Sequence, residues 1–177
     1  DWSSDVCSSD LVTVPVEEFE GKDVLAGMRL QEKYEAKAFE IGRRGEYRAP
    51  VQRAKDFARG VMTSGTPECS YPRGVITCNL REVLPPVVAA AVAHGLPQMD
   101  SRWHGRFLAD AVLAGPESRG SSPVRIDRDN ESRESPGVPG LFPVGEGAGY
   151  AGGIVSAAVD GLRTARAIIA KYAAVSA

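Results

Sequence analysis

The sequence predicts an α/β protein, which as an isolated piece also fits an α+β description because helices and strands fall in different regions. Apolar residues recur at helical spacing through most of residues 12–110, and short β-branched or apolar runs follow from residue 111. The chain then closes with a glycine-rich turn and one long amphipathic pattern. We therefore divide it into residues 1–11, a mostly helical region over residues 12–110 and a strand-and-turn region over residues 111–177.

The first predicted helix follows Asp23, whose side chain is a suitable N-cap, and Gly42 is its expected stop. A second helix is predicted over residues 50–60, because Pro50 suits a first helical turn and Gly60 suits a helix end.

The next segment, residues 62–79, contains two Pro and two Gly and therefore reads as an extended loop. A third helix is predicted over residues 80–103. We expect Pro97 to break it, because proline cannot donate the backbone hydrogen bond that a helix interior needs.

Short strands are predicted in the second region. They are DAVLAG at residues 110–115, the alternating run SSPVRIDRD at residues 121–129 and a buried LFPV at residues 141–144. A polar loop over residues 129–140 separates the last two. The closing helix is expected to start near Gly153, with an apolar stripe through Ile154, Ala158, Leu162, Ala165, Ile169 and Tyr172.

The first residues, DWSSDVCSSDL, back-translate codon by codon to a string that resembles a common sequencing-library adapter. We therefore expect residues 1–11 to be foreign to the natural protein, with native sequence missing upstream. Without Asp1, Asp5 and Asp10, 20 acidic residues face 21 basic ones, so the formal net charge of −2 becomes +1. Neither charge favours a nucleic-acid partner or an anionic membrane surface.

Composition is ordinary for a globular protein, with 43% apolar and 25% charged residues in a chain of 177. The longest apolar run, Val83–Pro97, is shorter than the roughly 20 residues that span a bilayer, so no membrane segment is expected. Cys69 and Cys78 lack zinc-ligand spacing, and no metal site is predicted. Two reduced thiols fit a cytoplasmic protein.

The stretch from Val144 to Gly161 contains GAGYAG, which fits the G-x-G-x-x-G template of a dinucleotide phosphate turn. A strand, a glycine turn and a helix would bring backbone N–H groups and a helix N-terminus to one point, which favours an anion. Glu146 is the expected buried carboxylate for sugar or ribityl hydroxyls. The alternatives are a merely tight turn, or a small non-catalytic module that binds phosphate or a peptide. A dehydrogenase that uses GAGYAG as its first nucleotide fingerprint is excluded, because no further strand follows.

The run GLFPVGEGAGYAGGIVSAAVDG resembles the carboxy-terminal flavin motif of uncharacterised bacterial FAD-dependent dehydrogenases, within the NAD(P)/FAD-dependent oxidoreductases. The segment ending in SSPVRI is similar to the same family, as are DVLAGMRLQEKYEAKAFEIG and YRAPVQRAKDFARG. The resemblance implies that residues 12–110 belong to an inserted substrate-side domain and residues 111–177 to a Rossmann-like FAD-binding domain. The adenine-binding half would then lie upstream, and the chain alone would be inactive.

The resemblance also implies a cofactor site. FAD would mediate hydride or electron transfer, with NAD(P)H as a candidate donor and an unidentified small molecule as substrate. Gly120 and Val144 depart from the family pattern, which more often has serine and alanine there. No catalytic acid or base is singled out. The implied cofactor-binding residues are Arg119, Ser121, Ser122, Pro123, Gly145, Glu146, Gly147, Gly149, Gly152, Gly153 and Ile154.

Overall fold

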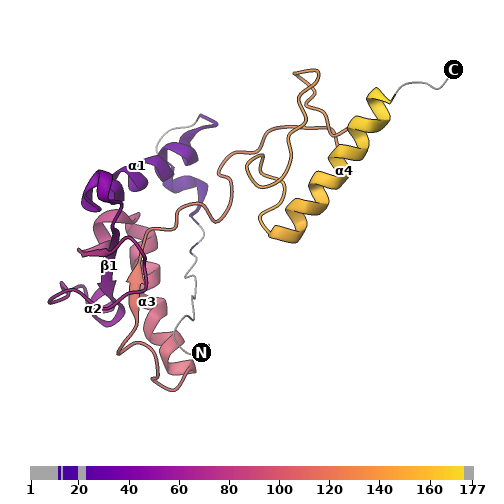
Figure 1. Ribbon diagram of the computed structural model, residues 1–177. Coiled ribbons are helices and arrows are strands. Elements are labelled where there is room, and N and C mark those ends of the chain that lie inside the picture. The colour runs from indigo at the N-terminus through magenta and orange to yellow at the C-terminus, as the bar shows by residue number, and fades with distance from the viewer. Residues whose placement is uncertain (1–11, 13, 20–22, 174–177) are drawn as a thin grey trace. The chain divides into compact units, whose positions relative to one another are not determined.

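A computed structural model describes residues 12, 14–19 and 23–173 (Figure 1). The expected adapter-derived segment, residues 1–11, lies outside the described residues. The described chain divides into two compact units. The first contains residues 12, 14–19 and 29–118, and the second contains residues 23–28 and 119–173.

The chain has an α/β fold, with helices and one small mixed sheet, as the sequence predicts. In chain order the elements are η1 (Val16–Glu18), α1 (Ala26–Ile41), η2 (Arg44–Glu46), β1 (Ala49–Arg53), α2 (Ala54–Arg59), β2 (Val75–Thr77), η3 (Leu80–Val83), α3 (Pro86–Arg102), β3 (Val112–Ala114) and α4 (Ile154–Tyr172).

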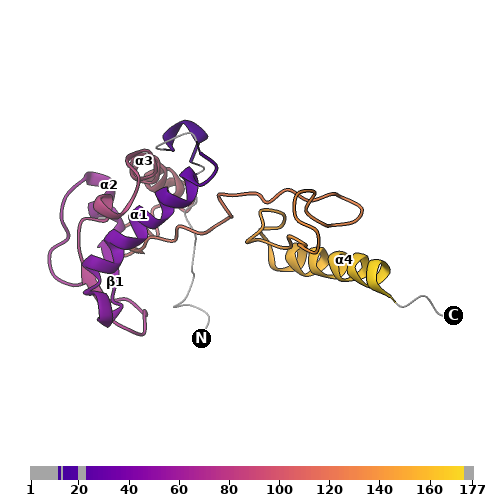
Figure 2. The same cartoon turned by 90° about the horizontal axis from the view of Figure 1, so that it is seen from above.

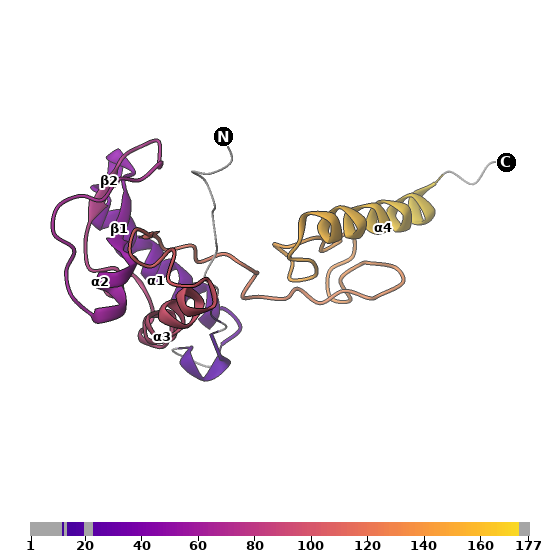
Figure 3. The same ribbon diagram turned by 90° about the horizontal axis from the view of Figure 1, so that it is seen from below.

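The sheet lies in the first unit, in the order β2-β1-β3. β1 is its centre: it pairs in parallel with β2 through Val51 and Thr77, and antiparallel with β3 through Val51 and Ala114. Figure 3 shows β2 beside β1. The side chain of Gln52 is buried and satisfied, because its Nε2 donates to the carbonyl of Val61 at 2.8 Å and its Oε1 accepts from Leu80 N–H at 2.9 Å.

The core of the first unit forms where α2 and α3 pack together (Figure 2). Phe57 of α2 is fully buried there, and the guanidinium carbon of Arg81 lies 5.0 Å from the centroid of its ring. Burying an aromatic side chain of this size is one of the larger single contributions to a small core. The buried members of the cluster are Ala54, Phe57, Leu80, Val83, Ala89 and Leu96.

The predicted ends of the first helix are confirmed. The Asp23 carboxylate accepts a hydrogen bond from Leu25 N–H at 2.9 Å, just before α1 begins. At the other end the helix stops at Gly42, where a β-carbon would lie 2.4 Å from the carbonyl oxygen of Arg48. Only glycine lets the chain turn back this closely.

The predicted helix over residues 50–60 is wrong in its first half. Pro50 belongs to β1, and α2 contains only Ala54–Arg59 before the left-handed Gly60 ends it. The segment between them is drawn into the sheet because two strands far away in sequence flank it. For the same reason the expected loop over residues 62–79 contains β2 at its end.

The expected break near Pro97 is also absent. α3 is continuous through Pro97, and residues 80–83 form a separate 3-10 turn before it. Neighbouring Leu96 is buried in the core, so packing holds the helix together despite the missing N–H donor.

In the second unit the described residues 119–153 contain no strand, so two predicted strands are wrong. Residues 124–126 are irregular, and Leu141 and Val144 of the expected buried strand are exposed. Their β-propensity finds no sheet partner within the described unit, and propensity without a partner does not make a strand. The predicted strand in DAVLAG is confirmed as β3, which lies in the first unit.

The closing helix is confirmed as α4, with Gly153 as its N-cap. Its apolar stripe nevertheless faces outward in the described unit: Ile154 is 93% exposed, Leu162 63% and Ile169 65%. The two buried residues of the helix, Asp160 and Thr164, lie on its inward face. Figure 1 shows the loops of this unit running alongside α4.

Candidate functional site

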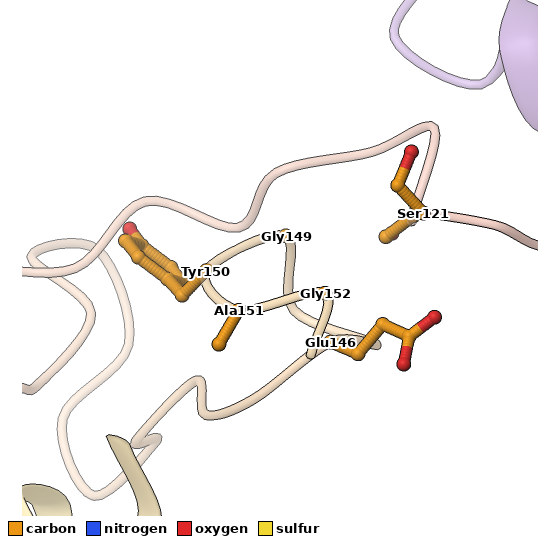
Figure 4. A pocket seen from close by; sticks show the side chains of 7 residues that line it. Ser121, Glu146, Gly149, Tyr150, Ala151 and Gly152 are labelled. Carbon is orange, nitrogen blue, oxygen red and sulfur yellow. The ribbon is translucent and has the colours of Figure 1, made fainter. Parts of the chain in front are cut away.

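A small pocket of the second unit gathers much of the predicted cofactor site (Figure 4). Its volume is about 190 Å³, below the roughly 300–1,000 Å³ of pockets that enclose a whole drug-sized ligand. It can therefore receive only part of a dinucleotide. The lining residues are Ser121, Ser122, Glu146, Gly149, Tyr150, Ala151 and Gly152.

The turn that forms the pocket depends on Gly149. This residue has a φ of +83°, and a β-carbon on it would lie 2.7 Å from the carbonyl oxygen of Val124 and 2.9 Å from Cα of Arg125. The Gly149 N–H donates to the carbonyl of Glu146 at 2.8 Å, and the Tyr150 N–H donates to the carbonyl of Gly145 at 3.1 Å. Glycine is thus required here by the fold itself.

At three other glycines of the loop there is space for an added β-carbon. β-Carbons on Gly145 and Gly147 would meet no atom within 4 Å, and one on Gly152 would come no closer than 3.9 Å to the carbonyl oxygen of Gly120. Gly145 still needs to be glycine because its φ is +71°. At Gly147 and Gly152 the structure supplies open space where a side chain would stand.

Glu146 is not the buried carboxylate that the sequence suggests. Its side chain is exposed, and Figure 4 shows it pointing away from the Tyr150 ring at the pocket. The buried carboxylate of this unit is Asp160 on α4, which is 8% exposed. Glu146 is free of the close packing that burial would impose, and its oxygens can accept hydrogen bonds from a hydroxyl-rich ligand.

The segment before the loop forms the opposite wall. The hydroxyl of Ser122 lies 2.8 Å from the carbonyl oxygen of Val124 and 3.2 Å from that of Gly147, so it links the two walls. Ser121 lines the pocket, whereas Arg119 and Pro123 do not. The described contacts therefore bring Ser121 and Ser122 to the glycine loop.

The amino end of α4 follows the pocket directly. Gly152 lines the pocket, Gly153 caps the helix, and Ile154 is its first residue. The Ser156 hydroxyl accepts from Gly153 N–H at 3.1 Å. The first backbone N–H groups of a helix have no acceptor within it, and together they carry partial positive charge. The pocket edge is thus suited to an anion or an electron-rich ring.

Beneath the loop lies a charged cluster that the sequence did not reveal. Both Asp160 oxygens bind Arg128, from Nη1 at 2.9 Å and from Nη2 at 2.7 Å, and Arg133 Nη2 donates at 2.6 Å. The Gly145 N–H donates to the same carboxylate at 2.9 Å. The Arg128 hydrogen bonds above all, helped by that of Gly145, hold the pKa of Asp160 well below its ordinary value, although burial alone would raise it.

No local pattern could have marked these residues. Asp160 lies 32 positions from Arg128, and Arg128 stands among other polar residues. The one available signal is that Asp160 interrupts an otherwise small and apolar stretch at the start of α4.

Within the described residues no helix is long and apolar enough to cross a membrane. Nor do the described parts of the chain hold any group of three or more His, Cys, Asp or Glu residues that could bind a metal ion. Cys69 and Cys78 are free thiols, and burial raises the pKa of Cys78 to about 11.

Residues 3–120 match the model of the FAD-dependent protein, C-terminal domain-like family. The match covers more than half of the chain. The chain belongs to this family. The matched range contains the described residues of the first unit. The glycine loop begins after the end of that range.

The chain is also similar to an uncharacterized protein of Clostridium beijerinckii, with 45% identity over 167 residues. The alignment includes 93% of this chain and 31% of that relative, so this chain spans about a third of the relative's length. Because so little of this chain is left out, the similarity extends into the second unit, where the glycine loop lies.

Proposed function

We propose that this chain is the carboxy-terminal part of an FAD-dependent oxidoreductase and that its glycine loop contacts the cofactor. The observation that carries the proposal is the pocket at the start of α4, in a chain of an FAD-dependent family. The pocket fits one section of such a ligand: it offers unhindered backbone at Gly152, an exposed carboxylate at Glu146 and a helix N-terminus at its edge.

Each of these residues would make a different contact with the cofactor. Glu146 would accept hydrogen bonds from ribityl or ribose hydroxyls, and Ser121 and Ser122 would flank the ligand from the opposite wall. Gly152, Gly153 and Ile154 would aim the helix N-terminus at it, and that partial charge favours electron density on a reduced ring. Gly145 and Gly149 would shape the turn, while Arg119 and Pro123 would act from outside the pocket lining.

Bound FAD would supply the hydride or electron transfer, which the side chains of this chain do not perform themselves. We propose NAD(P)H as the electron donor, an unidentified small molecule as substrate and a cytoplasmic location. The proposed arrangement assigns residues 12–110 to a substrate-side domain and residues 111–177 to a Rossmann-like FAD-binding domain. In it the chain alone would be inactive.

The exposed stripe of α4 supports a larger assembly. Ile154, Leu162 and Ile169 form an apolar face that the described unit leaves in water, and burying such a face is strongly favourable. In the proposed protein the remainder of the FAD-binding domain would cover this face.

The proposal is tested by replacing Gly152 with leucine in the full-length protein that contains this chain. The fold leaves room for that side chain, so we expect the melting temperature of the apoprotein to change little. The leucine would enter the pocket, and we expect FAD affinity to fall by roughly tenfold or more.

The matched control is Gly137→Leu, because Gly137 has no atom within 4 Å of an added β-carbon and lies outside the pocket. It should bind FAD like the wild type. A wild-type protein that binds no FAD would refute the function. Unchanged affinity in Gly152→Leu would remove Gly152 from the site. Bleaching of the bound flavin by NADPH or NADH without oxygen would test the donor.

A further inference from the structure

Two side chains outside the pocket hold the glycine loop at both ends. Arg128 Nη1 donates to the carbonyl of Pro143 at 2.6 Å, and Asp160 accepts from the Gly145 N–H at 2.9 Å. At the far end of the loop the Tyr150 ring lies 3.5 Å from the Arg128 guanidinium. These contacts join both ends of the loop between Pro143 and Tyr150 to the Arg128–Asp160 ion pair.

The pair is buried and geometrically specific. The side chain of Arg128 is 3% exposed and that of Asp160 is 11% exposed, and the two are joined by two parallel hydrogen bonds. Such a fork fixes the orientation of both groups, which a single charge contact does not. Neither side chain lines the pocket, so any effect on a ligand must pass through the loop.

A second guanidinium makes the arrangement depend on Asp160. Arg133 has a left-handed backbone, with a φ of +63°, and its Nη2 donates to the same carboxylate. Two positive groups thus converge on one negative group inside the unit. Without Asp160 they would repel each other, and the segment that carries them would lose its attachment to α4.

We propose that the Arg128–Asp160 pair positions the glycine loop for FAD and so sets the affinity of the site without touching the cofactor. The inference rests on the proposed function, because it needs FAD at the pocket. Arg128 and Asp160 are positioning residues. Arg128 contacts the two ends of the loop, at the Pro143 carbonyl and the Tyr150 ring, and Asp160 accepts a hydrogen bond from the Gly145 amide.

Arg128→Lys and Asp160→Asn in the full-length protein test this role, with FAD as the probe. Lysine keeps the positive charge beside Asp160 but cannot form the fork, so this variant should fold. We expect the Kd for FAD to rise roughly tenfold in Arg128→Lys and at least as much in Asp160→Asn. The visible circular dichroism of the bound flavin should also change at saturating FAD, because the loop around it has moved.

The matched control is Glu134→Gln. Glu134 joins Lys171 of α4 to the preceding loop, as Arg128 joins Asp160, but its carboxylate binds Lys171 and the Gly140 N–H, both of which lie outside the glycine loop. We expect this variant to retain wild-type FAD affinity and the wild-type dichroism spectrum. If Glu134→Gln weakens FAD binding as much as Arg128→Lys does, any loosening of α4 is enough to lower the affinity. The positioning role of the Arg128–Asp160 pair is then overturned.

The remaining outcomes separate this inference from the function on which it rests. If the wild type binds FAD and both Arg128→Lys and Asp160→Asn bind it equally well, the positioning role fails while the cofactor site stands. If the wild type binds no FAD, both fail together. Should Asp160→Asn not fold, the result for Arg128→Lys decides alone.

Discussion

Replacement of Gly149 by alanine should open the glycine loop. A non-glycine residue in the left-handed region costs roughly 1–2 kcal/mol, and the observed φ is +83°. The added β-carbon would also lie 2.7 Å from the carbonyl oxygen of Val124 and 2.9 Å from Cα of Arg125. Overpacking of this kind costs about 1–3 kcal/mol. We therefore expect a local loss of about 2–5 kcal/mol.

The Tyr150 amide reports this loss directly, because it donates to the carbonyl of Gly145 across the loop at 3.1 Å. Hydrogen exchange measures the free energy of such local openings. A loss of about 2 kcal/mol or more would speed exchange of this amide by roughly thirtyfold or more. Global unfolding is a poorer assay, since a chain of two units need not unfold in one step.

Gly147→Ala is the control, because it lies in the same loop with no atom within 4 Å of the added carbon and no positive φ. Its effect should stay within about 0.5 kcal/mol, as for an unhindered surface change. Exchange of the Tyr150 amide at the wild-type rate in Gly149→Ala would refute the steric argument. An equal acceleration by both substitutions would refute it as well.

Two further predictions concern ionisable groups. The pKa of Asp160 is depressed in the folded chain, so its ionised form adds stability that is present above the ordinary value of 3.8 and is lost as the pH falls below it. An acid titration followed by circular dichroism should therefore be steeper for the wild type than for Asp160→Asn, and equal slopes would contradict this. At Cys78 the pKa rises from 9.0 to about 11, which lowers the thiolate fraction roughly hundredfold at pH 8. Iodoacetamide should label Cys78 far more slowly in the folded chain than in urea, as peptide mass mapping would show, and equal rates would refute the burial.

The sequence predicted best the features that local chemistry controls. The ends of α1 follow from the capping carboxylate of Asp23 and from the close turn at Gly42. α4 is long enough and periodic enough to be recognised by itself, and its start at Gly153 was predicted correctly.

The sheet was harder to predict because its centre depends on distant partners. Residues 49–53 carry no alternating apolar pattern, and they become β1 through pairing with residues 75–77 and 112–114. The opposite error occurred at residues 124–126 and 141–144, which have strand-like composition but no described partner. Strand formation is a property of the pairing more than of the single segment.

The cofactor site stays a prediction, although four of its predicted residues come together. Ser121, Ser122, Gly149 and Gly152 line one pocket. The expected burial of Glu146 was wrong, and the buried carboxylate is Asp160, which binds two arginines far away in the chain. Spacing within a motif carries no information on such pairs.

Helix α4 connects its exposed apolar face to the glycine loop, because Asp160 on its other face binds the Gly145 amide. Successive residues of an α-helix are turned by about 100°, so a small rotation about its axis moves both faces together. Whatever docks against Ile154, Leu162 and Ile169 would fix that rotation, and with it the point where Asp160 meets the Gly145 amide. Correct seating of the outer face would then be a precondition for a correctly shaped loop. Incorrect packing against the outer face of α4 would then change the position of Asp160 and, through it, the shape of the glycine loop.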